Sequence, residues 1–241
     1  MRWLIIYFSF LISSAHADDA MQPIKGFAID VKEVSIGSFA EFVAQTGYKT
    51  AAERSGGGMV YASGWEFMPG WTWKTPFGVP ADPNEPAVHV NFEDATAYCQ
   101  WAGKRLPTEQ EWRLAAYTET REEPDNGFVK GRTYPYPTGD SPKGANCLGD
   151  CGPTPAIDHS DKLERGIGHA PVGQTVAGVN GLYDMGANVW EWAEDSPRSS
   201  SKPTMGGSWW YGAYRMHRDD GARKPLGTAV VYIGFRCAKT L

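Results

Sequence analysis

The spacing of apolar residues predicts a helix early in the chain. Phe39, Phe42 and Val43 recur at i, i+3 and i+4, which places them on one face of a helix. Ser35 stands where an N-cap is expected, and Gly47 is a typical stop.

Capping patterns predict two more helices. Asn91 can cap a helix with Asp94 at position N3, and Gly103 would end it. Thr108 and Glu111 form a capping box before the next apolar run.

The rest of the chain shows little regular periodicity. Glycine and tryptophan dominate residues 56–86, which predicts a long loop region. Residues 127–167 are turn-rich, and from residue 170 onward short strand-like runs alternate with turns. We find no internal repeat and no linker, so the pattern predicts a single α+β domain with little regular secondary structure.

Composition narrows the function classes. The 241 residues carry a net charge of −5 and no basic run, which argues against a nucleic-acid partner. The chain has 10 Trp, 28 Gly and 17 Pro, so aromatic rings are expected to supply much of the buried area between loops.

The N-terminus is typical of an export signal. Arg2 precedes an apolar run that is too short to span a bilayer, and Ala15-His16-Ala17 matches a cleavage site. We therefore expect a signal peptide over residues 1–17 and a domain over 18–241. The protein is expected to be periplasmic or secreted, with no membrane span after cleavage.

The four cysteines favour disulfides in an exported chain. Three pairings are possible. We choose Cys147–Cys151, which closes a small loop, together with Cys99–Cys237. A zinc site is the alternative, but no partners stand out at metal-ligand spacing.

Several blocks together resemble the formylglycine-generating enzyme (sulfatase-modifying factor) family. They cover nearly the whole of the mature chain, in the family's order: 27–53, 86–116, ANC (145–147), APVGQ (170–174), NGLYDMGANVWEWAED (180–195), MGGSW (205–209) and GFRCA (234–238). The resemblance implies a single elaborated C-type-lectin-like domain. It also implies a Cys99–Cys237 disulfide.

Two departures from the family pattern stand out. Only residues 18–26 precede Phe27, so the strand or hairpin that usually opens the domain is expected to be short or absent. In the copper-dependent oxidases of the family, two cysteines occupy the positions that are Tyr211 and Met216 here. A phenol and a thioether cannot replace two thiolates as Cu(I) ligands, so copper is not expected at this site.

The segment GGSWWYGAYRMHRDD (206–220) remains the candidate ligand site. The resemblance places Trp190 and Ser208 along the family's substrate groove. Flat rings beside cations suit a peptide or small-molecule ligand with aromatic or anionic groups, although any single Trp could simply be core. The expected contacts are Trp190, Ser208, Trp209, Trp210, Tyr211, Tyr214 and Arg215. Candidate catalytic groups are Ser208, Tyr211 and His217, the last as a general base.

The resemblance also implies structural calcium. Asp184, Glu191 and the carbonyls of Ala187 and Val189 would supply hard oxygen ligands. A weaker second site would use Asn146 and the carbonyl of Cys147. Ordinary acidic turns are the alternative at both places.

Three functions remain open from the sequence. One is an exported oxidoreductase or modifying enzyme that acts on a peptide-derived substrate without the copper–thiolate pair. The alternative is a catalytically inactive module that binds a peptide or small ligand. The third is a subunit of an export or respiratory assembly, which an exposed aromatic strip in residues 56–86 would support. The oligomeric state is not readable from the sequence.

Overall fold

The computed structural model describes residues 20–196 and 198–241. The predicted signal peptide over residues 1–17 lies outside these ranges. In the described residues, no helix is both long and apolar enough to cross a membrane.

The first predicted helix is confirmed as α1 (Ile36–Thr46). The Ser35 hydroxyl accepts a hydrogen bond from the Ser38 amide, and Gly47 ends the helix in the left-handed conformation. Its apolar face packs into the core through Phe39 and Phe42.

The two predicted capping boxes are also present, on α3 (Phe92–Trp101) and α4 (Glu109–Tyr117). In each, the N-cap side chain accepts from the N3 amide while the N3 carboxylate accepts from the N-cap amide. The same motif at Thr50 and Glu53 begins a short helix, α2 (Ala51–Ser55), which we did not predict.

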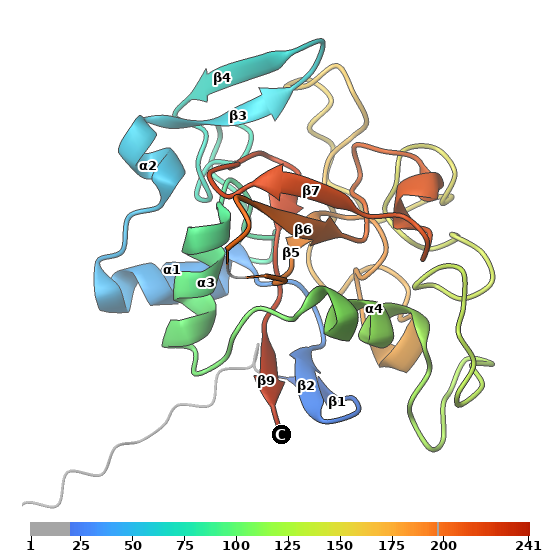
Figure 1. The fold of residues 1–241 in the computed structure, drawn as a ribbon. Helices are drawn as coiled ribbons and strands as arrows, with labels where there is room; N and C mark the ends of the chain where they lie inside the picture. Colours follow the sequence, from blue (N-terminus) through green and yellow to red (C-terminus); the bar gives the residue numbers. More distant parts are fainter. Residues whose placement is uncertain (1–19, 197) are drawn as a thin grey trace, which may run out of the picture.

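The region expected to be a long loop contains a β-hairpin. Strands β3 (Gly57–Tyr61) and β4 (Trp65–Pro69) pair in antiparallel register and project from one end of the molecule (Figure 1). The prediction failed because glycines and aromatic residues obscure the two-residue alternation of this hairpin. By contrast, residues 127–167 form turns and isolated bridges, as expected.

Two further sheets hold the domain together. Strand β2 (Phe27–Asp30) lies between β1 (Met21–Pro23) and β9 (Ala238–Thr240), so the opening element is present but only three residues long. The central sheet has the order β7 (Ala222–Pro225), β6 (Ser201–Met205), β5 (Trp190–Trp192) and β8 (Ile233–Gly234), with β5 and β8 parallel. Two 3₁₀ turns, η1 (Val179–Gly181) and η2 (Ala213–Met216), complete the elements.

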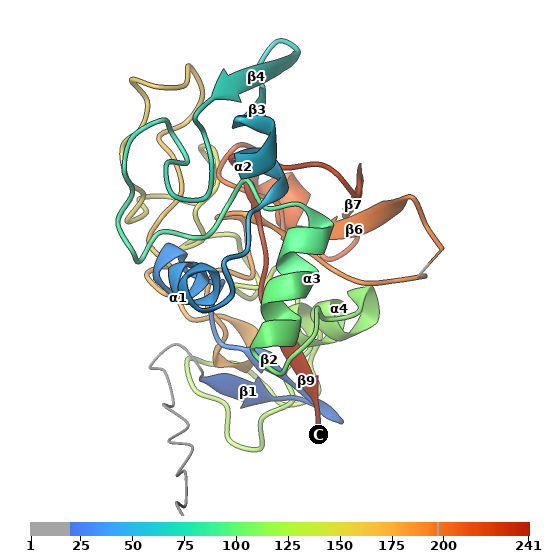
Figure 2. The ribbon, with the colours of Figure 1, turned by 90° about the vertical axis from the view of Figure 1, so that its left-hand side faces the viewer.

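Aromatic rings fill the main core, as the composition predicts. Phe39 stacks on Tyr98 with ring centroids 5.7 Å apart, and Phe235 meets both rings edge-on. These contacts join α1 and α3, which lie side by side in Figure 2, to the C-terminal strand region. The mixture of short strands, helices and loops confirms the predicted α+β domain.

Both chosen disulfides are confirmed: Cys99–Cys237 spans 138 residues of sequence and Cys147–Cys151 spans four. None of the described cysteines is free.

Loop length predicts unequal contributions from the two disulfides. Replacing Cys99 and Cys237 with alanine should lower the free energy of unfolding by about 5 kcal/mol, since the bond closes a long loop in the unfolded chain. The same change at Cys147 and Cys151 should cost about 2 kcal/mol. Urea unfolding of both variants measures the difference, and equal losses would contradict it.

The buried imidazole of His89 is expected to make the free energy of unfolding depend on pH. Burial lowers the pKa of this imidazole to about 4, from an ordinary 6.5, while its Nε2 lies 3.0 Å from the Pro76 carbonyl. Protonation therefore favours the unfolded chain. The contribution of neutral His89, about 3 kcal/mol, is complete above pH 6.5 and is lost as the pH falls to 4.

Unfolding of His89→Gln across the same pH range should show a shallower slope than the wild type. Partly buried His217 supplies the control variant, His217→Asn, whose slope should match the wild type. An unchanged slope in His89→Gln would contradict the assignment.

Candidate ligand-binding site

The predicted site segment, residues 206–220, follows strand β6 and begins with two glycines. It then passes beneath residues 162–168. Trp209 and Trp210 are both buried, with ring centroids 5.1 Å apart in an edge-on arrangement. Arg165 Nε donates to the Trp210 carbonyl, and a Cβ on Gly166 would lie 3.2 Å from the Trp209 ring. Residues 162–168 therefore lie directly against the tryptophan pair.

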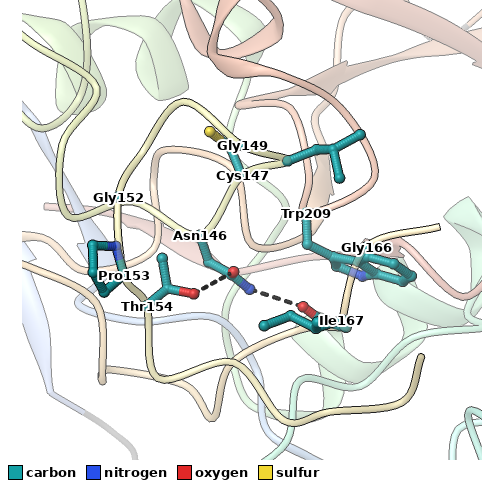
Figure 3. Close-up of a pocket in the computed structure, with 11 residues that line it drawn as sticks. Asn146, Cys147, Gly149, Gly152, Pro153, Thr154, Gly166, Ile167 and Trp209 are labelled. Atoms are coloured by element: carbon teal, nitrogen blue, oxygen red, sulfur yellow. Dashed lines mark hydrogen bonds between the residues drawn. The ribbon is translucent and has the colours of Figure 1, made fainter. Parts of the chain in front are cut away.

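This crossing segment separates two pockets. The first, which we call the disulfide pocket, has a volume of ≈ 350 Å³ and lies beside Cys147, with Trp209 forming part of its wall (Figure 3). Asn146 lies in the same wall, where it donates to the Gly168 carbonyl and accepts from the Thr154 hydroxyl. Its lining is Asn146, Cys147, Leu148, Gly149, Gly152, Pro153, Thr154, Gly166, Ile167, Gly168 and Trp209.

The second, which we call the hairpin pocket, has a volume of ≈ 410 Å³. It lies between the β3–β4 hairpin and residues 162–165, and Trp210 forms part of it. Adjacent tryptophans thus face different pockets. The lining of the hairpin pocket is Val60, Ala62, Ser63, Glu66, Met68, Lys162, Leu163, Glu164, Arg165 and Trp210.

Two guanidinium groups lie close to the Tyr211 ring. The Arg165 and Arg215 groups are each 5.9 Å from the centre of this ring. Arg165 is also 5.5 Å from the Trp210 ring and Arg215 is 5.0 Å from the Trp190 ring. Both distances lie within the range of cation–π attraction. Sequence reasoning missed Arg165, because nothing local links it to a motif 45 residues away.

Tyr211 also contacts Tyr232, whose ring centroid is 5.9 Å away. Burial raises the pKa of the Tyr232 phenol, and the neighbouring Tyr211 phenol raises it further. The Tyr232 phenol can therefore act as a neutral hydrogen-bonding group at neutral pH. Arg215 is fixed from the other side by Asp220, with 2.9 Å between Nη1 and Oδ1.

The seven predicted ligand contacts do not form one surface. Trp190, Ser208, Trp209 and Trp210 are buried, and the tryptophans among them act mainly as core. Tyr214 is 64% exposed, whereas Tyr211 and Arg215 are partly buried. The accessible part of the site is therefore the aromatic and cationic surface formed by Arg165, Tyr211, Tyr214 and Arg215, which we call the Tyr211 surface.

The candidate catalytic groups lie in different environments. Ser208 is fully buried, and its Oγ accepts a hydrogen bond from the Trp210 amide. His217 lies against Tyr136 and accepts from the Asp219 amide through Nδ1. None of the contacts described for His217 joins it to Ser208 or Tyr211, so this arrangement gives no support to a base–nucleophile pair.

Met216, at the second position of the copper pair, is buried under the small disulfide loop. Its sulfur lies 3.9 Å from Cys151 Sγ, and alanines of the same apolar cluster surround it. This buried thioether cannot supply the second thiolate of the copper pair.

The predicted calcium loop is tightly turned. Asp184 and Ala187 have positive φ, and Asn188 shares this conformation. The Asp184 carboxylate accepts from the Thr175 hydroxyl and the Gly173 amide. Glu191 accepts from Trp112 Nε1 and, with both oxygens, from Arg236.

Three buried carboxylates lie near this loop. Glu33, Asp184 and Glu191 are all buried, and Arg236 is the cation that faces them. Burial raises the pKa of Glu33 well above its usual value, and the two other carboxylates raise it further. The three carboxylates offer the oxygen ligands that a calcium ion takes, but Glu191 could act as a ligand only by sharing an oxygen with Arg236.

The weaker calcium candidate lies in the disulfide pocket. There the Asn146 side-chain oxygen already accepts from Thr154 and its amide donates to Asn188 Oδ1. This network accounts for Asn146 without an ion.

Comparison with known proteins identifies the family. The model of the sulfatase-modifying factor enzyme 1-like domain matches residues 11–241. The chain belongs to this family. A formylglycine-generating enzyme from Thermomonospora curvata is 34% identical over 257 residues, covering 88% of this chain and 81% of that protein.

Other members differ in activity. The inactive C-alpha-formylglycine-generating enzyme 2 of Mus musculus is 32% identical, covering 90% of this chain and 76% of its own length. The structure of PvdO from Pseudomonas aeruginosa has a TM-score of 0.60 at 22% identity, covering 89% of this chain and 80% of that one, and shows the shared fold. The fold predicted from the resemblance is thus confirmed.

Proposed function

We propose that this sulfatase-modifying-factor-like protein binds a peptide or small ligand carrying aromatic and anionic groups, without copper-dependent formylglycine chemistry. The observation that carries this proposal is the placement of two guanidinium groups within 5.9 Å of the centre of the Tyr211 ring. Rings and fixed cations together recognise a flat or negatively charged group.

The same geometry disfavours oxidation by the family's copper route. The thiolate positions hold a phenol and a buried thioether, and all four cysteines are paired. Among relatives, the mouse protein named as inactive shows that the domain also occurs without this activity. A modifying enzyme with a different mechanism is the alternative function.

Two adjoining features extend the proposed ligand site. The hairpin pocket shares Arg165 and Trp210 with the region around Tyr211, so a peptide could continue from one to the other. Tyr61, Trp65 and Phe67 of the hairpin are exposed, and Tyr61 lies 5.2 Å from Trp65. This aromatic strip in residues 56–86 is also the feature expected of an assembly subunit.

We place the protein outside the cytoplasm, in the periplasm or secreted. Two disulfides support an oxidising compartment, and the export-signal pattern of residues 1–17 agrees with it. Calcium remains part of the proposal as a structural ion near Asp184, where it would order the 184–191 loop.

Chelation tests the calcium proposal. Dialysis against EGTA should lower the melting temperature, and stoichiometric Ca²⁺ should restore it, because an ion held only by the folded state stabilises that state. Asp184→Ala should lose this response. Glu164→Gln, at an acidic residue outside the loop, should keep it, and an identical response in the two variants would contradict the assignment.

The ligand proposal is tested with a labelled peptide rich in glutamate and tyrosine, compared with a lysine-rich peptide of equal length. Fluorescence anisotropy should show preferential binding of the acidic peptide. Tyr211→Ala and Arg215→Ala should each raise its Kd about tenfold through loss of a cation–π contact and a charge. The preference for the acidic peptide should weaken as the salt concentration rises.

Arg132 supplies a matched control, because its guanidinium also lies over a ring, that of Tyr134, outside the proposed site. Arg132→Ala should bind as the wild type does. If Tyr211→Ala and Arg215→Ala bind normally and only melt earlier, the residues serve the core and the proposed site is wrong.

A further inference from the structure

Three side chains from distant parts of the sequence converge on one point. Glu85, His159 and His169 each offer one ligand atom, and these atoms lie within 4.8 Å of one another. His169 Nε2 is 2.6 Å and His159 Nε2 is 3.6 Å from the same carboxylate oxygen, Glu85 Oε2.

The carboxylate is held in place by the backbone. The Asp82 amide donates to Glu85 Oε1 at 2.7 Å, which leaves Oε2 facing the imidazoles. Glu85 and His169 are buried, whereas the His159 side chain is 14% exposed. The cluster is therefore enclosed on most sides and reaches solvent at His159.

The two histidines are fixed relative to each other by main-chain hydrogen bonds. The His159 amide donates to the Ile167 carbonyl at 2.5 Å, and the Ile157 amide donates to the His169 carbonyl at 3.0 Å. Gly168 permits this approach, since its φ is 130° and a Cβ there would lie 2.6 Å from the Ile157 carbonyl oxygen. Phe77 stacks on the His159 ring at 3.8 Å and sets its orientation.

Hydrogen bonding within the protein leaves the cluster incompletely satisfied. Within the described parts of the chain, His159 Nε2 and His169 Nδ1 are buried atoms without a hydrogen-bond partner. Buried polar atoms are normally paired, so each such atom calls for an explanation. For His159 Nε2, a bound cation between the imidazole and Glu85 would supply the missing partner.

We propose that Glu85, His159 and His169 bind one divalent transition-metal ion such as Zn²⁺. Two imidazoles and one carboxylate form a donor set that suits such an ion, and water molecules would complete its coordination. On binding, the proton on His169 Nε2 moves to Nδ1 and the nitrogen lone pair forms the metal bond, so the hydrogen bond to Glu85 is replaced.

The site lacks one feature of the strongest metal centres. Ligating histidines usually donate their second N–H to an acceptor, and loss of that partner typically weakens affinity by 10–100-fold. His169 Nδ1 has no such acceptor among the described residues. We therefore expect the affinity to lie below that of a fully supported zinc centre.

The test uses the purified protein, stripped of metal and returned to chelator-free buffer containing excess Ca²⁺, so that the calcium loop does not compete. Titration with Zn²⁺ against an indicator dye should show one equivalent bound. The melting temperature should rise by roughly 5–10 °C at a free Zn²⁺ concentration of about 100 Kd. Co²⁺ should give a visible absorption band characteristic of nitrogen and oxygen coordination.

His159→Gln is the decisive variant, because His159 is the ligand nearest solvent and its loss should disturb folding least. It should weaken Zn²⁺ binding at least about 100-fold while the far-UV circular dichroism spectrum stays unchanged. Glu85→Gln should behave similarly. His217→Asn and Glu164→Gln, which change the same residue types elsewhere, should bind Zn²⁺ as the wild type does.

Two results would overturn the proposal. One is the absence of a stoichiometric Zn²⁺ site in the wild-type protein. The other is equal affinity in the wild type and His159→Gln, which would place the metal elsewhere. Neither result bears on peptide binding at the Tyr211 surface, so this proposal and the proposed function can fail separately.

Discussion

The buried ion pair between Glu191 and Arg236 is the interaction on which the rest of the domain depends. Arg236 donates to both oxygens of Glu191 and also to the carbonyls of Asp30 and Tyr183. Trp112, on α4, donates a further hydrogen bond to the Glu191 carboxylate through Nε1. Four segments far apart in the sequence are thereby joined at one point, because Tyr183 and Glu191 belong to the same stretch of chain. Removing one partner of such a pair typically costs 3–5 kcal/mol, because the other charge stays buried.

This arrangement explains how a loop-rich chain holds a defined surface. Strand β5, which carries Glu191, also places Trp190 under Arg215. The following strand, β6, leads into the tryptophan pair, and residues 162–168 close over that pair without any regular secondary structure of their own. The site is thus formed by loops on a small rigid frame, a common location for binding residues.

Helix starts can be predicted from the sequence where the residues that determine them are close neighbours in the chain. Caps at Ser35, Asn91 and Thr108 mark helix starts correctly because one side chain satisfies amides within three residues. The Glu85, His159 and His169 cluster could not be predicted in this way. Its members are separated by up to 84 residues, and only the path of the turn-rich segment brings them together. Likewise, Gly166 lies against the Trp209 ring, a contact that no periodicity in the sequence reveals.

The segment 162–168 has a consequence of its own, because it is the shared wall of two pockets. Its first half borders the hairpin pocket and its second half borders the disulfide pocket. A molecule that moves this wall on entering one pocket changes the free energy of filling the other. Thermodynamic linkage makes that effect reciprocal and equal in both directions. Two ligands, one in each pocket, would therefore change each other's affinity through these seven residues without being in contact.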